Sequence, residues 1–190
     1  MGDVPDFEHK VDIQPKRLGF EPFNASNPVR EFASGNPDLD SFLCTEEVAE
    51  YDHQNLGRTT LVYYEGDLVG FFTVCVDGLA LDYVVAKRTA KSFVKLGDAT
   101  VDRIPSIKIG RLAVDRKYQN KGIGRYIVKR IVGYALDVSD QFAVRLIIVE
   151  SKEQSIDFYL KCGFQLTVET KGQKKRRNRT LFFDLDSVRK

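Results

Sequence analysis

Residues 111–125 (RLAVDRKYQNKGIGR) constrain the fold of this chain more than any other stretch. Residues 107–114, which overlap the start of this stretch, are rich in aliphatic side chains and end at a polar turn, which is typical of a buried strand. From Ile123 to Ala135, apolar residues recur every three to four positions, which predicts a helix with one apolar face. The segment therefore predicts a strand, a short turn and a helix in direct succession.

Two glycines, Gly122 and Gly124, stand where the turn enters this helix. A residue without a Cβ lets the backbone approach a ligand closely, and the first N–H groups of a helix have no partner within it. The positive end of the helix dipole adds to this, so the turn predicts a site for a pyrophosphate. A tight glycine turn without a ligand is the alternative. Neither the dinucleotide fingerprint nor the Walker loop is present.

A known family combines such a turn with a second motif. Gln119, Gly122 and Gly124 fill the pattern Gln/Arg-x-x-Gly-x-Gly/Ala, which resembles the acetyl-CoA loop of the GNAT acyltransferases. A strand at 145–150 and a helix at 151–161 are expected next, and residues 158–164 (FYLKCGF) match the ending Phe-Tyr-x-x-x-Gly-Phe of that family. The two motifs occur in the family's order and cover about half of the chain.

The resemblance implies an α/β (α+β) GNAT fold. Its central mixed sheet, mostly antiparallel, would have about six to seven strands, be splayed at the acetyl-CoA site and be flanked by about four helices. One domain is expected over 1–190, with its core at about 10–186. The implied reaction is transfer of an acetyl group from the cosubstrate acetyl-CoA to a primary amine, by direct attack in a ternary complex. No metal is expected.

The resemblance also assigns roles to single residues. The Val114 N–H would polarise the thioester carbonyl, and Tyr159 would protonate the departing thiolate, although a packing role for this ring is the alternative. Lys152 and Ser155 stand where the family often has Asn and Ala, so contacts from this helix to pantetheine stay open. The residues implied to bind acetyl-CoA are Leu112, Ala113, Val114, Gln119, Asn120, Lys121, Gly122, Ile123, Gly124, Arg125, Ser155, Phe158 and Tyr159.

The sequence leaves the general base open. An alkyl amine with a pKa of about 10.4 is protonated at neutral pH and needs a carboxylate or a water relay. Many family members place a Glu on the strand before the loop, where this chain has Lys108 and Arg111. Either Glu150, at the end of the neighbouring strand, is the base, or the acceptor is an amine of lower pKa, such as an α-amine at about 7.7–8.0. Glu150 as a solvated strand end is the alternative to catalysis.

A basic run lies between two predicted strands of a hairpin, 164–168 and 180–185. Six cations in the nine positions 171–179 could bind the phosphates of RNA, or keep an edge hairpin soluble. Aromatic side chains that could stack on bases are missing from the run. The residues predicted to contact substrate or RNA are Arg111, Lys174, Lys175, Arg176 and Arg177.

The amino-terminal half narrows the resemblance. A helix is expected to start at Pro37 with Asn36 as its N-cap, and residues 60–64 and 68–76 predict a β-hairpin. This arrangement, with Gly70-Phe71-Phe72, is similar to the GNAT branch that contains toxins acetylating the α-amine of charged tRNA. A small amine, a protein amine and aminoacyl-tRNA all remain as acceptors. A catalytically idle module that binds CoA and acts on RNA is the non-enzymatic alternative.

Composition limits the remaining functions. The net charge of +2 makes the basic character local to residues 171–179, and three cysteines with two histidines build neither a metal site nor a Ser-His-Asp triad. The first ten residues are too polar for a signal peptide, and no apolar run is long enough to span a membrane, so a cytoplasmic protein is expected.

Residues 78–103 predict a short amphipathic helix that would line the acceptor cleft or form a homodimer face.

Overall fold

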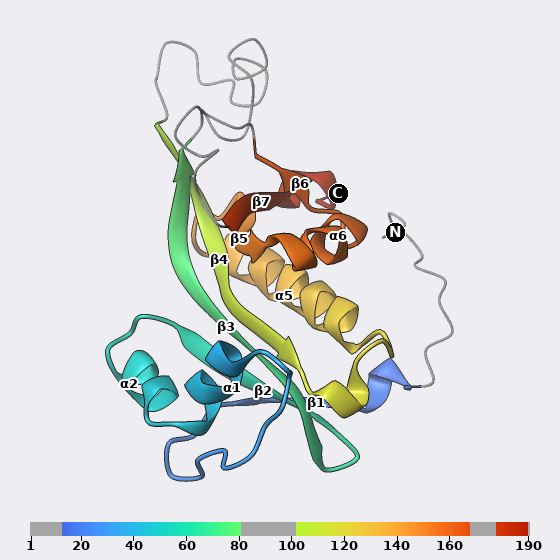
Figure 1. The fold of residues 1–190 in the computed structure, drawn as a ribbon. Helices are drawn as coiled ribbons and strands as arrows, with labels where there is room; N and C mark the ends of the chain where they lie inside the picture. Colours follow the sequence, from blue (N-terminus) through green and yellow to red (C-terminus); the bar gives the residue numbers. More distant parts are fainter. Residues whose placement is uncertain (1–12, 81–101, 168–177, 190) are drawn as a thin grey trace. The chain divides into compact units, whose positions relative to one another are not determined.

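The computed structural model describes residues 13–80, 102–167 and 178–189. Seven strands form a sheet in the order β1-β2-β3-β4-β5-β7-β6 (Figure 1). They are β1 (Leu18–Pro22), β2 (Arg58–Tyr64), β3 (Asp67–Ala80), β4 (Arg103–Val114), β5 (Leu146–Lys152), β6 (Gln165–Leu166) and β7 (Asn178–Asp184). The helices are α1 (Pro37–Cys44), α2 (Glu47–His53), α5 (Ile123–Ser139) and α6 (Glu153–Lys161), with 3-10 turns η1 (Pro15–Arg17), η2 (Arg116–Tyr118) and η4 (Leu185–Ser187).

The described chain divides into two compact units. The first contains Asp3–Cys75 and Ile109–Arg130, and the second contains Val76–Lys108 and Ile131–Lys190. Strands β3 and β4 and helix α5 contribute residues to both. The predicted turn after β4 therefore belongs to the first unit, and Tyr159 and Glu150 belong to the second.

In the first unit, α1 and α2 cover one face of the sheet (Figure 1). The predicted start of α1 is confirmed, because the Asn36 side chain accepts a hydrogen bond from the Asp38 N–H at 3.2 Å and Pro37 follows the cap. Burial of apolar surface holds these helices against the sheet. The buried residues shared by helices and strands are Phe42, Leu43, Val48, Leu61, Phe71 and Ala113.

The predicted hairpin of the first unit is also confirmed. Tyr64 pairs with Asp67 across an antiparallel turn, in which Glu65 and Gly66 have φ angles of 55° and 94°. Strand β1, which pairs antiparallel with β2, and helix α2 were not predicted. Both are short segments without a clear period of their own.

In the second unit, β5 and β7 pair antiparallel from Leu146 opposite Asp184 to Lys152 opposite Asn178. The hairpin of β6 and β7 confirms the predicted strand pair, although β6 is only two residues long. Residues 171–177 of the basic run, and residues 81–101 of the segment expected to form a helix, lie outside the described residues. The apolar face of α5 is confirmed, since Ile123, Ile127, Val128, Ile131 and Ala135 are buried.

Candidate active site

The turn between β4 and α5 is built to accept an anion. Asn120 and Gly122 have φ angles of 61° and 82°, a region that glycine enters freely and asparagine tolerates. Within the described residues, the N–H groups of 120–124 donate to no backbone carbonyl, and the first such bond of the helix joins the Tyr126 N–H to the Gly122 carbonyl at 3.1 Å. Unpaired N–H groups at a helix N-terminus are the arrangement that binds phosphates. The turn therefore fits the diphosphate of acetyl-CoA.

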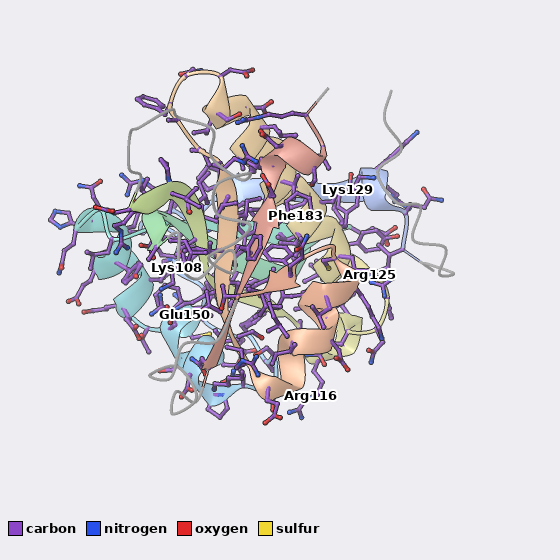
Figure 2. The ribbon with its side chains drawn as sticks, turned by 90° about the horizontal axis from the view of Figure 1, so that it is seen from above. Lys108, Arg116, Arg125, Lys129, Glu150 and Phe183 are labelled. Carbon is purple, nitrogen blue, oxygen red and sulfur yellow. The ribbon has the colours of Figure 1, made fainter. Side chains whose placement is uncertain are left out.

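Basic residues precede this turn, lie within it and follow it along the chain of the first unit. Arg116 precedes it, Lys121 lies within it with its Nζ 5.3 Å from the centre of the Tyr118 ring, and Arg125 and Lys129 follow on α5 (Figure 2). Cations near a helix N-terminus raise the local potential that attracts phosphates. Charge and backbone geometry thus favour the same class of ligand.

The side chain of Gln119 has partners that the sequence did not indicate. Its Nε2 donates to the Ser34 carbonyl at 2.7 Å and to the Val114 carbonyl at 3.0 Å. Both bonds stay inside the protein, so this carboxamide is engaged by backbone oxygens. The prediction grouped Gln119 with the phosphate ligands, and the structure gives its side chain a different set of contacts.

The end of β4, where the thioester contacts were predicted, lies tightly against β3. A Cβ at Gly70 would come within 2.7 Å of the Ala113 carbonyl oxygen and 3.4 Å of the Ile127 Cδ1. Glycine is therefore required for the close approach of β3, β4 and α5. Ala113 is buried, whereas Leu112 and Val114 are half-buried.

Tyr159 lies near the end of α6, in the second unit, and is buried. Its ring meets those of Phe158 and Phe164 edge-on, at 5.0 and 5.4 Å between centroids. Among the described residues its hydroxyl has no hydrogen-bond partner. Burial, and to a lesser extent the nearby Cys162, raises the pKa of Tyr159 above the ordinary value of 10.0. The phenol therefore stays protonated at neutral pH, as both a packing residue and a proton donor require.

Glu150 is held by a cation on the neighbouring strand. Lys108 of β4 places its Nζ 3.1 Å from the Glu150 Oε1 and 3.7 Å from the Asp77 Oδ2 (Figure 2). The Lys108 side chain is 25% exposed, and that of Glu150 is 46% exposed. The sequence placed Glu150 at the end of a strand, with a solvated strand end as the alternative to catalysis. In the structure, β5 continues two residues past Glu150, and the carboxylate is paired with Lys108.

The family model of the acetyltransferase (GNAT) family matches residues 28–164. This chain belongs to the GNAT family. It is an acetyl-CoA-dependent N-acetyltransferase, as the two motifs predicted, and its seven strands and four described α-helices have the GNAT fold.

Relatives of this GNAT enzyme differ in their acceptors. A tRNA-acetylating toxin of Mycobacterium tuberculosis is 28% identical over 75% of this chain and 81% of the toxin. A spermine/spermidine N(1)-acetyltransferase of Bacillus subtilis is 25% identical over 67% of this chain and 70% of that protein. The solved structure of AtaT complexed with acetyl-methionyl-tRNAfMet has a TM-score of 0.74 at 24% identity, covering 90% of this chain and 96% of that one. This last comparison shows that the two chains share a fold.

Arg111 of the GNAT enzyme makes contacts that a substrate role does not explain. Its guanidinium carbon lies 3.6 Å from the centre of the Phe42 ring and 4.7 Å from that of Tyr51, and its NH2 group is 3.1 Å from the Glu47 Oε1. These cation–π and ionic contacts tie β4 to α1 and α2. A contact of Arg111 with substrate or RNA stays a prediction, as do those of Lys174, Lys175, Arg176 and Arg177, which lie outside the described residues.

Two features are absent from the part of the chain that the structure describes. There, no three His, Cys, Asp or Glu side chains come together as a metal site would require. Helices long and apolar enough to cross a membrane are likewise missing from these residues. Ser155, in the first turn of α6, is half-buried, and the Lys152 side chain forms no capping bond.

Proposed function

We propose that this GNAT enzyme acetylates the α-amine of aminoacyl-tRNA. The observation that carries the proposal is the ion pair of Lys108 with Glu150, at 3.1 Å. Lys108 stands on the strand where many family members have a glutamate, and it pairs with Glu150, the carboxylate of the neighbouring strand that could serve as the base instead. A strongly basic alkyl amine would therefore find no uncommitted base on these strands, whereas an α-amine, with a pKa of about 7.7–8.0, arrives partly neutral.

The proposed reaction uses few protein groups. The neutral amine attacks the thioester carbonyl while the Val114 N–H stabilises the developing oxyanion. The C–S bond then breaks and, in the role that the family resemblance implies, Tyr159 gives its proton to the leaving thiolate. The new amide loses its extra proton to water, from which the phenolate regains a proton. The turn at 119–125 holds the diphosphate of the donor through backbone N–H groups and nearby cations.

Two further observations support a tRNA acceptor. The relative from Mycobacterium tuberculosis is named as a tRNA-acetylating toxin. The basic run at 171–179 offers a match for the phosphates of an RNA acceptor. Such an acceptor implies a cytoplasmic protein. A single domain over 1–190 and a homodimer stay predictions.

A polyamine is the second candidate acceptor, because one relative is a spermine/spermidine acetyltransferase. Polycations are recognised by uncompensated carboxylates. In the second unit, however, Asp77 and Glu150 are both paired with Lys108, and Asp77 also with Arg103 at 3.7 Å. The charge around Glu150 therefore favours an acceptor that brings phosphates over one that brings ammonium groups.

The test is transfer of labelled acetyl from acetyl-CoA to charged tRNA, uncharged tRNA, spermidine and total protein in parallel. We expect label in charged tRNA only, lost on mild alkaline deacylation, with a rate that stops rising above about pH 8 as the α-amine becomes neutral. Label in spermidine alone, rising to about pH 10, would refute the proposal.

A variant sharpens this test. Lys108→Glu removes the cation and sets a second carboxylate beside Glu150, and like charges at that distance make one carboxylate a stronger base. We expect this variant to gain acetylation of spermidine. An unchanged acceptor range would show that Lys108 does not limit the choice of amine.

A further inference from the structure

The turn between β4 and α5 would hold the acetyl donor and is called the donor turn below. It is tied to the segment before α1 by several hydrogen bonds between residues far apart in the sequence. The Arg116 N–H donates to the Ala33 carbonyl at 2.8 Å, and the Ala33 N–H donates to the Asp115 Oδ2 at 3.4 Å. Gln119 adds its bond of 2.7 Å to the Ser34 carbonyl. Residues more than 80 positions apart thus form one hydrogen-bonded layer.

That layer continues into α1. The Asp40 Oδ1 accepts from the Ser34 N–H at 2.8 Å and from its hydroxyl at 2.5 Å, and the Oδ2 accepts from the Gly35 N–H at 3.3 Å. The Arg116 guanidinium covers Gly35, where a Cβ would come within 2.7 Å of its NH2 group. Ser34 is therefore held from both sides, by Gln119 and by Asp40.

We propose that Gln119 is a positioning residue, whose carboxamide binds Ser34 and Val114 and so fixes the donor turn against the start of α1. The bond to the Val114 carbonyl, at 3.0 Å, orients the last peptide of β4, directly after the N–H assigned to the oxyanion. One side chain thereby links the pieces that must be in place before acetyl-CoA binds. The inference rests on the proposed donor site and is independent of the acceptor.

A phosphate ligand and a positioning residue predict different results. A ligand acts only when acetyl-CoA is present, whereas a positioning residue orders the free protein. Glutamate at position 119 keeps the length of the side chain but has no N–H to donate, and it would face two carbonyl oxygens. Arginine, which the family pattern also allows, keeps the N–H donors.

The experiment measures amide hydrogen exchange of the free protein, together with KM and kcat for acetyl-CoA, in Gln119→Glu, Gln119→Arg and Asp40→Asn. We expect Gln119→Glu to raise exchange at residues 33–36 and 115–119 at least 10-fold and KM for acetyl-CoA about 10-fold, with the acceptor KM unchanged. Gln119→Arg should restore most of both effects. Asp40→Asn, which reaches no phosphate, should raise exchange at 33–36 as well.

Tyr118→Phe is the matched control. The Tyr118 hydroxyl donates to the Asp67 Oδ2 at 2.5 Å, so this variant breaks a bond of the same turn without touching Ser34. Exchange at 33–36 should then stay at the wild-type rate. Unchanged exchange in Gln119→Glu with a higher KM would make Gln119 a phosphate ligand and overturn the inference. If exchange in the Gln119 variants changes as expected but the wild-type protein does not acetylate charged tRNA, only the proposed acceptor is refuted.

Discussion

The donor turn and the Lys108–Glu150 pair meet their chemical tasks in different ways. The turn offers backbone N–H groups set by the φ angles of Asn120 and Gly122, and its cations lie within a few residues. The pair consists of side chains on β4 and β5, 42 positions apart, whose meeting depends on the order of the sheet. The comparison teaches that the proposed donor site rests on local backbone geometry, whereas the proposed control of acceptor choice rests on a charge arrangement between strands.

Replacement of Tyr159 should produce the largest change, because it removes chemistry while leaving the donor turn intact. Tyr159→Phe keeps the ring between Phe158 and Phe164 and should lower kcat by about 100-fold or more, as loss of a general acid does, with KM for acetyl-CoA within about 2-fold. Steady-state kinetics measures both. Tyr134→Phe, on the more exposed surface of α5, is the control. Equal kcat in both variants would leave Tyr159 a packing residue.

Neutralising the basic run at 171–179 tests whether these residues contact the acceptor. We expect weaker tRNA binding, by about 10-fold or more at low salt, when glutamine replaces Lys174, Lys175, Arg176 and Arg177. The slope of log K against log salt should fall in magnitude by up to about 3. Filter binding over a salt series measures it. Acetyl-CoA affinity should not change, since the donor turn keeps its own cations. An unaltered salt slope would show that the basic run does not bind the acceptor and serves solubility instead.

A glycine substitution tests the backbone geometry of the donor turn. Gly122→Ala forces a side chain into the left-handed region at a cost of about 1–2 kcal/mol, and should raise KM for acetyl-CoA about 10-fold. Gly133→Ala lies in α5 with open space at its Cβ and should stabilise the protein by about 1 kcal/mol. Kinetics and urea unfolding measure both. A normal KM in Gly122→Ala would contradict the assigned diphosphate site.

The smallest effect is on stability at high pH. Burial raises the pKa of Tyr159 in the folded state, so its stabilising contribution is complete below the unfolded pKa of about 10 and is lost as pH rises toward the folded pKa. The free energy of unfolding should fall above pH 10 by up to about 1.4 kcal/mol per pH unit from this group. Urea unfolding at pH 9, 10 and 11 should show a shallower fall in Tyr159→Phe. Parallel pH profiles would contradict the burial of this phenol.

Much of the donor side could be predicted from the sequence. The strand before the turn, the helix after it and the cap at Asn36 follow from short-range patterns, and the structure confirms them with small shifts at the ends. Strand β1 could not be predicted, because its five residues gain their order from pairing with β2 rather than from a pattern of their own. The same applies to α2, which is seven residues long.

The side chains of the site also divide into those predicted by short-range patterns and those whose contacts depend on distant residues. The glycine turn follows from the motif, and a packed Tyr159 ring was one of the two roles that the sequence left open. Three long-range contacts could not be predicted in this way, because Ser34 lies 85 positions from Gln119, Glu150 lies 42 from Lys108 and Glu47 lies 64 from Arg111. A cation or amide in the sequence shows only that a partner is needed.

The sequence by itself determined the donor turn, because glycine conformations and a helix N-terminus depend on a few neighbouring residues. It also determined the family and the reaction, through two motifs within one half of the chain. The tertiary structure decided which groups those motifs leave available. Sheet order brings Lys108 to Glu150, and the packing of the segment before α1 brings Ser34 to Gln119, because long-range pairing is set by the whole fold and not by local preference.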